Sequence, residues 1–402
     1  MIIFPQHTLK INLPRGAASK RETAHRRGGD KKRGNLLKSY NGLFDKMIER
    51  PETVAAIKEA ARYKKGRKAV ANILADKENK AEITCRKLER GTWNPPHHEK
   101  QRIQEGSHKK VREIVKPRFD DEQIIHHMLV KQLRPIIEPR LYHYAFGSLP
   151  GRGPHKAVRN MERWRNEYGG RRFYVLEADV KKFYDNVDTR LLKSKLRRRI
   201  RDKRYLEVMD KVIDATAPGL PKGFYTSPWL ANFYMEDFDN FVVQVLKPDH
   251  YLRYMDNIFV FHRNKKELHR IRRKIAAFLW ERLKLQLKDD WQVFRFEGVN
   301  RRTQKKGGRA INALGFVVHC DRVTIRKSIL KRTRAKANHI HRKKRYTRHD
   351  AASMLSRMGA FKHANAYNYY LKYIKPKVSI HYCKRRLSTL ARKNSEKVSD
   401  TA

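Results

Sequence analysis

RFYVLEADVKKFYDNV, residues 172–187, decides the fold of this chain. Its first half is short, is rich in β-branched and aromatic residues, and ends at an acid, Asp179, which predicts a buried strand over 172–180. A second acid lies in YLRYMDNIFVF (251–261), where two apolar runs flank Met255-Asp256-Asn257. This pattern predicts a β-hairpin with Asp256 and Asn257 at its tip.

The charge balance points to an anionic partner. The 402 residues include 94 Lys and Arg against 41 Asp and Glu, a net charge of +53, and 40% are hydrophobic, which excludes a wholly disordered chain. Nucleic acid is the partner that this charge favours, with an anionic membrane surface as the weaker alternative. No apolar run is long enough to span a membrane, the first residues do not resemble a secretory signal, and three separated cysteines are typical of a reducing cytoplasm.

Asp179 and Asp256 stand out against this basic background. Two carboxylates held close together are costly unless a cation neutralises them, and Mg²⁺ prefers carboxylate and phosphate oxygens. Carboxylates at strand ends, a glycine-bounded loop at 219–223 and a phosphate-binding surface together indicate two-metal nucleotidyl transfer. The alternative is that the two residues are an ordinary strand-end and an ordinary turn aspartate.

Four segments carry a family resemblance. They resemble motifs A, B, C and E of reverse transcriptases, in the same order: ADVKKFYDNV (178–187), GLPKGFYTSPWLAN (219–232), YMDN (254–257) and ALGF (313–316). Upstream, VREIVKPRF (111–119) and GSLPGRGPHKA (147–157) resemble fingers segments of bacterial retroelement enzymes. The sequence is most similar to stand-alone prokaryotic reverse transcriptases: those of diversity-generating retroelements, group II-intron-like enzymes and phage-defence systems.

The resemblance implies an α+β, right-hand polymerase fold. Residues 1–104 would form a basic N-terminal arm, over about the first 34 residues, and a helical extension from about Leu36 to Arg90, followed by a polar connection over 92–106. The fingers would span 105–171 and the palm 172–320, with a helical insertion at about 189–218 and an antiparallel sheet. Residues 321–402 would form a basic helical thumb and tail.

Local patterns refine these boundaries. We expect Asp188 to cap a basic helix over about 189–203, and Ser227 with Pro228 to start the next helix. We also expect an amphipathic helix over 267–285 and strands over 293–296 and 310–318.

The resemblance also assigns site residues. Asp179 and Asp256 would be catalytic and would bind Mg²⁺, or Mn²⁺, with the Val180 carbonyl and Asn257 as further ligands. The incoming nucleotide would contact five residues: Lys110 and Arg112 at the triphosphate, Tyr184 as a steric gate against a ribose 2′-hydroxyl, and Lys222 and Gly223 in the loop. A core aromatic is the alternative for Tyr184, and a solvated cation is the alternative for Arg112.

Template and primer would contact further residues. In the palm and fingers these are Arg152, His155 and Ser227, for which turn and helix-cap roles are the alternatives. In the thumb they are Arg326, Lys327, Arg332, Arg334, Lys343 and Lys344.

Three departures from the family pattern matter. Motif C ends Asp-Asn instead of Asp-Asp, so metal binding should be weaker or shifted toward Mn²⁺. Lys222 stands where glutamine is common, and Lys288 is displaced from the position of the usual general-acid lysine, so no proton donor is assigned. The histidine pairs 97–98 and 126–127 lack metal-ligand spacing and are interpreted as structural or RNA-contacting.

These observations predict an RNA-directed DNA polymerase. It would be a bacterial or phage-encoded cytoplasmic enzyme that works with a structured non-coding template RNA, a primer or cDNA strand and dNTPs, with an accessory protein or a homo-oligomer as further options and no membrane partner. Three different functions stay open beside it: a catalytically impaired RNA-binding scaffold, an RNA polymerase and an untemplated nucleotidyltransferase.

Overall fold

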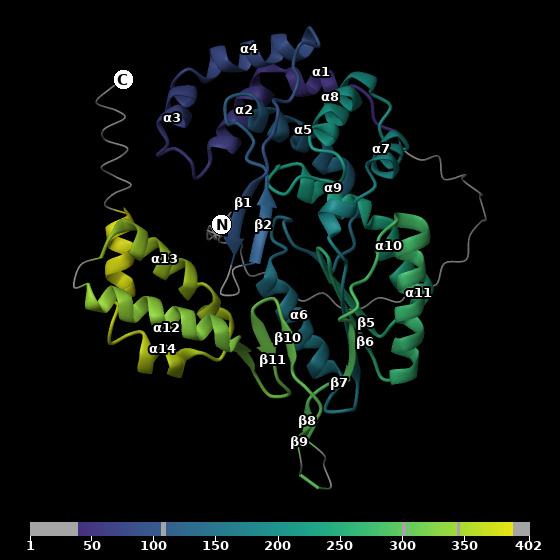
Figure 1. Ribbon diagram of the computed structural model, residues 1–402, viewed down its shortest axis with the longest axis vertical. Coiled ribbons are helices and arrows are strands. Elements are labelled where there is room, and N and C mark those ends of the chain that lie inside the picture. Colours follow the sequence, from purple (N-terminus) through teal and green to yellow (C-terminus); the bar gives the residue numbers. More distant parts are fainter. Residues whose placement is uncertain (1–38, 106–109, 300–302, 305, 344–345, 389–402) are drawn as a thin grey trace, which may run out of the picture.

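The computed structural model describes residues 39–388 apart from 106–109, 300–302, 305 and 344–345. A central sheet lies between a helical layer at one end and a separate helical unit at the side (Figure 1). The expected basic arm over the first 34 residues, Lys344 and the end of the tail lie outside the described residues. Within the described residues, no helix is both long and apolar enough to cross a bilayer.

In the part of the chain that the structure describes, the helical layer contains four helices within the residues expected to form the helical extension and a fifth within the expected fingers. Its helices are α1 (Leu43–Ile48), α2 (Arg50–Ala61), α3 (Lys68–Ala75), α4 (Lys77–Glu89) and α5 (Glu122–Ile137), followed by the short turn η1 (Glu138–Arg140). Helix α5 is buried over most of its length, and α1 and α2 pack against it (Figure 1). It forms the centre of a core that continues into the sheet.

A two-stranded ribbon follows α4 in the chain. Strands β1 (Gln101–Glu105) and β2 (Lys110–Ile114) pair antiparallel, with Ile103 opposite Arg112. The expected polar connection over 92–106 is therefore wrong for its last residues. Those residues have no strand-like alternation of their own, and their backbone groups are satisfied by a partner strand that a local pattern does not reveal.

The central sheet has the strand order β3-β5-β6-β4-β7. Its strands are β3 (Ala145–Phe146), β4 (Tyr174–Asp179), β5 (His250–Tyr254), β6 (Asn257–His262) and β7 (Gln292–Arg295), all antiparallel except for the β3–β5 pair. Successive side chains of β4 enter different cores: Val175 faces one side, and Leu176 the other. The predicted strand 172–180 and the predicted hairpin 251–261 are both present.

Helices cover both faces of this sheet. Helix α6 (Pro154–Glu167) packs on the face that Val175 lines, through Val158, Met161 and Trp164. The other face is covered by α9 (Ser227–Tyr234), α10 (Glu236–Asn240), the π-helical turn η3 (Phe241–Leu246) and α11 (Lys265–Leu283). Helix α11 confirms the amphipathic helix expected at 267–285.

The insertion between the first two motifs is helical, as expected. After η2 (Phe183–Asn186), Asp188 caps α7 (Thr189–Arg197) by accepting hydrogen bonds from the Arg190 and Leu191 amides. The expected single helix over 189–203 is wrong, because the chain turns after α7 and a second cap, Asp202, starts α8 (Lys203–Asp214). Asp202 accepts from the Tyr205 amide, so its side chain begins a helix where periodicity alone suggested a continuation.

A small three-stranded sheet joins the palm to the thumb. After the hairpin of β8 (Gly298–Val299) and β9 (Lys306–Gly307) come β10 (Ile311–Ala313), β11 (Phe316–Val318) and β12 (Val323–Ile325). The expected single strand over 310–318 is wrong, since Leu314 and Gly315 adopt φ values of 55° and 89° and reverse the chain. Strand β12 was not expected.

The thumb is helical, as expected, and it has its own core. It comprises α12 (Lys327–Arg342), α13 (Arg348–Met358), the turn η4 (Ala360–His363) and α14 (Tyr367–Tyr373), packed around Ala337, Ile340, Met354 and Ile374. Asp350, the one acid between 322 and 393, is buried. It closes a capping box with Thr347 and pairs with Lys336 at 2.6 Å, so this acid fixes α13 against α12.

Candidate active site

Asp179 and Asp256 meet at adjacent strand ends. Asp179 is the last residue of β4 and lies opposite Asn257, the first residue of β6. The Val180 amide donates to the Asp256 carbonyl at 3.0 Å, and Met255 takes the positive φ of 53° that the tight turn requires. The two acids therefore lie side by side because of strand register.

The negative charges of Asp179 and Asp256 are close enough to repel each other. Burial, and then the charge of Asp179, raise the pKa of Asp256, while Lys288 and Arg112 act in the opposite direction. Lys288 Nζ lies 2.5 Å from Asp179 Oδ1, and Asn257 donates its side-chain amide to Asp256 Oδ1 at 3.1 Å. A cation at this position would relieve the repulsion, so the carboxylate pair fits a divalent metal.

Tyr184 lies beside this pair. It lies in η2, which begins four residues after Asp179, and burial, and then the charge of Asp256, raise the pKa of its hydroxyl. The Leu220 amide donates to the Tyr184 carbonyl at 2.7 Å, and a Cβ on Gly219 would lie 2.6 Å from the same oxygen. The glycine thus allows the loop 219–226 to lie directly against the turn that carries Tyr184.

The same loop also lies against the fingers. The Val115 amide donates to the Lys222 carbonyl at 2.8 Å, and Gly223 has a φ of 127° with its missing Cβ position only 2.0 Å from the Val115 carbonyl oxygen. Lys222 Nζ donates to Asp185 Oδ2 at 2.7 Å. In this arrangement the Lys222 charge is engaged by an acid of the neighbouring turn.

The fingers ribbon brings positive charge to the site. Arg112 is exposed on β2, and its charge is close enough to lower the pKa of Asp256. Lys110 pairs through its backbone with Glu105, and its side chain lies outside the described part of the chain.

A buried arginine supports the hairpin. Arg253 is fully buried on β5, and its guanidinium donates to both carboxylate oxygens of Asp239 at 2.8 and 2.7 Å. The third nitrogen donates to the Met255 carbonyl at 2.9 Å, directly before Asp256. The sequence patterns did not predict this pair; an arginine inside an apolar strand was the available signal.

Of the three palm and fingers residues expected to contact template or primer, two have structural partners and one is buried. Arg152 donates to the Tyr142 carbonyl at 2.8 Å. His155 stacks on His363 of the thumb at 4.0 Å, and burial lowers its pKa to about 4, so the ring is neutral near pH 7. Ser227 is only 1% exposed, which contradicts a nucleic-acid contact in this arrangement. It is also not the helix cap, since α9 has Thr226 at that position.

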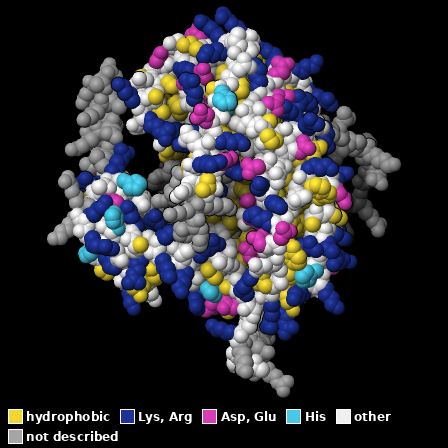
Figure 2. Space-filling view, in the orientation of Figure 1, with side chains coloured by type: hydrophobic (Ala, Val, Ile, Leu, Met, Phe, Trp, Pro, Cys, Tyr) yellow, Lys and Arg dark blue, Asp and Glu magenta, His cyan; other side chains and the backbone are white. Residues whose placement is uncertain are grey.

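Of the described thumb residues expected to contact template or primer, one lies at the junction with the palm and four are exposed. Arg326 donates to Asn312 Oδ1 at 2.8 Å and so belongs to the junction with β10, and Arg334 lies 4.4 Å above the ring of Tyr373. Lys327, Arg332 and Lys343 are exposed, as is Arg334. Figure 2 shows lysine and arginine side chains over this unit, next to the central part of the molecule.

The fingers histidines pack behind the same loop. His126 is fully buried 4.5 Å from the ring of Phe224, and His98 Nε2 lies 2.6 Å from Glu122 Oε1. Burial raises the pKa of Glu122 to about 7. Among the residues that the structure describes, no group of three or more His, Cys, Asp or Glu gathers into a metal-binding cluster. The contacts favour the structural interpretation of these histidines.

Comparisons with known proteins identify the family of this chain. Residues 100–303 match the family model "Reverse transcriptase (RNA-dependent DNA polymerase)". The chain is 30% identical over 178 residues to the group II intron-encoded protein LtrA of Lactococcus lactis subsp. cremoris, which covers 42% of this chain and 29% of that protein. It is 29% identical over 147 residues to protein YkfC of Escherichia coli K12, covering 34% and 38% of the two chains.

A solved structure is also similar. Telomerase from Candida albicans in complex with a TWJ fragment of telomeric RNA matches with a TM-score of 0.42 and 12% identity, over 63% of this chain and 52% of that one.

The matched family model covers half of the chain, and the chain belongs to the reverse transcriptase family. Its fold is the right-hand polymerase fold, which confirms the expected α+β architecture of fingers, palm and thumb. The similarity to prokaryotic retroelement enzymes is confirmed by the intron-encoded relative. The chain spans less than two fifths of the length of these curated relatives.

The first prediction concerns the close approach at Gly223. Gly223→Ala should destabilise the protein by about 2–4 kcal/mol, from backbone strain plus the clash with the Val115 carbonyl. Gly91→Ala is the matched control, because Gly91 also has a positive φ but open space around it, and it should cost only about 1–2 kcal/mol. Urea unfolding measures both, and equal losses would contradict the packing of the loop on the fingers.

The second prediction concerns the buried ion pair. Arg253→Met should destabilise the fold by about 3–5 kcal/mol, because it leaves Asp239 buried and uncompensated. The double variant Arg253→Met/Asp239→Leu should lose less than the sum of the single variants. Arg163→Met, which breaks the exposed pair with Glu167, should cost less than about 1 kcal/mol. Additive losses at Arg253 and Asp239 in a double-mutant cycle would show that the pair is not coupled.

Proposed function

We propose that this protein is an RNA-directed DNA polymerase that extends a primer by two-metal nucleotidyl transfer. The observation that carries the proposal is the placement of Asp179 and Asp256 at neighbouring strand ends in register, with Tyr184 beside them. The reaction is the attack of a primer 3′-hydroxyl on the α-phosphate of a deoxynucleoside triphosphate, with release of pyrophosphate. It depends on positioning and on charge, which a preorganised site supplies.

Asp179 and Asp256 would hold the metal, with the Val180 carbonyl and the Asn257 side-chain oxygen as further ligands. Two Mg²⁺ ions, or Mn²⁺, would supply charge stabilisation for the attacking and leaving oxygens. The Lys288 ammonium group pairs with the Asp179 carboxylate, and the charge of Arg112 acts to lower the pKa of Asp256. These cations partly offset the repulsion between the two carboxylates.

The surrounding residues would bind and select the nucleotide. Arg112, exposed on the fingers ribbon, suits the triphosphate, with Lys110 as its neighbour on the same strand. Tyr184 beside Asp256 would exclude a 2′-hydroxyl, and Gly223 would allow the loop to approach the nucleotide. Lys222 would contribute through its ion pair with Asp185, or directly once that pair opens.

The partner nucleic acids would lie along the basic thumb. Lys327, Arg332, Arg334 and Lys343 are exposed there and suit a sugar–phosphate backbone, with Lys344 as a further expected contact. We propose a structured RNA as template and a primer or cDNA strand as substrate, in a bacterial or phage retroelement or defence system within the cytoplasm. An accessory protein or self-association would complete the assembly.

Asn257 and Lys222 favour a second candidate function, an RNA-binding scaffold that has lost catalysis. Asn257 donates its amide to Asp256 instead of adding a third carboxylate, and Lys222 is paired with Asp185. An RNA polymerase and an untemplated nucleotidyltransferase fit the site less well. Tyr184 argues against ribonucleotide substrates in either of them.

The third prediction tests the metal ligands. Asp256→Asn should lower primer extension on an RNA template with dNTPs and Mg²⁺ by ~10³-fold or more, because a catalytic carboxylate is lost. Asp289→Asn, an exposed acid with the same change of charge, should retain the activity of the unmodified protein. Undiminished synthesis by folded Asp256→Asn protein would refute the assignment. Tight RNA binding without any incorporation by the unmodified protein would favour the scaffold.

The fourth prediction tests the steric gate. Tyr184→Ala should lower the preference for dNTPs over NTPs by ~10–10²-fold, because the ring that crowds the 2′-hydroxyl is gone. Tyr184→Phe keeps the ring and should keep the preference. Single-nucleotide incorporation with both substrate classes measures the ratio. An unchanged ratio in Tyr184→Ala would place the ring in the core without a selective role.

A further inference from the structure

Helix α7 carries a stripe of cations that the polymerase site does not use. Its outward side chains line a surface hollow of about 560 Å³ together with Ser194 and the residues that follow the helix. We call this set the α7 patch: Arg190, Lys193, Arg197, Arg198 and Arg201. The leucines of the same helix, Leu191, Leu192 and Leu196, pack into the core.

The spacing of three of these cations along the sequence places them on one side of α7. Positions 190, 193 and 197 recur at three or four residues and therefore lie on one side of α7, and Arg198 and Arg201, which follow the helix, line the same hollow. From Arg190 to Arg197 the helix rises by about 10 Å, a length over which duplex nucleic acid presents several phosphates. The patch is therefore continuous on the scale of a sugar–phosphate backbone.

Only part of this charge is neutralised within the protein. Lys193 pairs with Asp214, and Arg197 pairs with Asp210. Across the described residues, the side chains of Arg190, Arg198 and Arg201 have no acidic partner, and all three are exposed. Three guanidinium groups thus face solvent beside one another.

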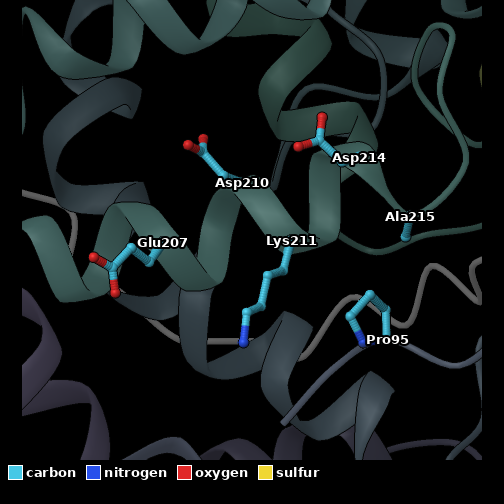
Figure 3. A pocket seen from close by; sticks show the side chains of 6 residues that line it. All are labelled: Pro95, Glu207, Asp210, Lys211, Asp214 and Ala215. Atoms are coloured by element: carbon cyan, nitrogen blue, oxygen red, sulfur yellow. The ribbon is translucent and has the colours of Figure 1, made fainter. Parts of the chain in front are cut away.

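The neighbouring helix α8 supplies the acids that lie beside the α7 patch. Helix α8 lines a second hollow of about 540 Å³ with Glu207, Asp210, Lys211 and Asp214. Figure 3 shows the carboxylates of Asp210 and Asp214 on the opposite side of α8 from the Lys211 amine, which donates to the Gly91 and Trp93 carbonyls. Since Asp210 and Asp214 are already paired with Arg197 and Lys193, a polyanion would be attracted mainly to the unpaired side chains of Arg190, Arg198 and Arg201.

The patch lies away from the thumb. In Figure 1, α7 and the thumb helices α12–α14 lie on opposite sides of the central sheet. A primer–template duplex that contacts the thumb does not account for the α7 patch. Its occupant is a different segment of an anionic molecule.

Two other occupants fit the observations less well. The chain reaches the described part beside the patch, where Tyr40 exchanges backbone hydrogen bonds with Arg199 and Arg201. Residues 1–38 carry ten Lys or Arg and two acids, so like charge excludes them as the occupant. A membrane surface is disfavoured because the leucines of α7 are turned into the core and leave no apolar side chain to insert.

We propose that the α7 patch binds the sugar–phosphate backbone of an RNA segment outside the polymerase cleft. It would hold a structured part of the same RNA whose single-stranded part is copied. The inference rests on RNA being the template, but it does not depend on the metal ligands or on the steric gate.

The fifth prediction tests this site by neutralising the three unpaired cations. The triple variant Arg190→Gln/Arg198→Gln/Arg201→Gln should bind an RNA hairpin with a long stem at least ~10-fold more weakly at low salt, and the slope of log Kd against log[KCl] should fall by about 2. The matched control is Lys266→Gln/Arg273→Gln/Lys274→Gln on α11, with three exposed cations and the same charge change, and it should stay within about twofold of the unmodified protein.

Binding is measured in EDTA, so the result is independent of the proposed metal site. Thermal unfolding of both triple variants checks that they are folded, and extension of a short unstructured primer–template should be unchanged in both. Equal losses in the two triple variants, or no loss in either, would overturn the proposal. Loss of binding to phosphatidylglycerol vesicles with RNA binding retained would also overturn it and would assign the patch to a membrane.

Discussion

The structure depends on holding two like charges together at the end of one pair of strands. Asp179 and Asp256 lie side by side because β4 and β6 pair in a register that sets Asp179 opposite Asn257. Arg253 stabilises this register. It is fully buried, it donates hydrogen bonds to both carboxylate oxygens of Asp239, and it donates a further one to the Met255 carbonyl. A buried arginine with all these partners tolerates little displacement, so the hairpin tip is rigid before any metal binds.

Glycines connect this rigid centre to the fingers. Gly219 allows the loop 219–226 to lie on the backbone of Tyr184, and Gly223 allows it to lie on Val115. The loop therefore contacts the carboxylate site on one side and the ribbon that carries Arg112 on the other. Any shift of the fingers would be transmitted to the neighbourhood of Tyr184 through backbone contacts, which cannot be relieved by a rotamer change.

Several acids of this strongly basic chain form ion pairs that stabilise particular parts of the fold. Asp239 holds Arg253, Asp350 holds the thumb helices together, and Asp210 and Asp214 neutralise part of α7. Among the described residues, exposed cations gather on the thumb and on α7, which lie at opposite sides of the central sheet (Figure 1). A member of the reverse transcriptase family with two such surfaces is suited to an RNA that extends beyond the cleft.

The sequence by itself determined the elements with strong local patterns: the strand that ends at Asp179, the hairpin around Asp256, the cap at Asp188 and the helical thumb. Alternation, turn residues and capping side chains act within a few residues, so they can be read without a fold. Only the tertiary structure decided that β1 and β12 form, that 310–318 folds back at Leu314 and Gly315, and that Thr226 precedes α9 where Ser227 was expected to cap it. It also decided that Arg253 pairs with Asp239, because such contacts satisfy groups distant in sequence and leave no local pattern.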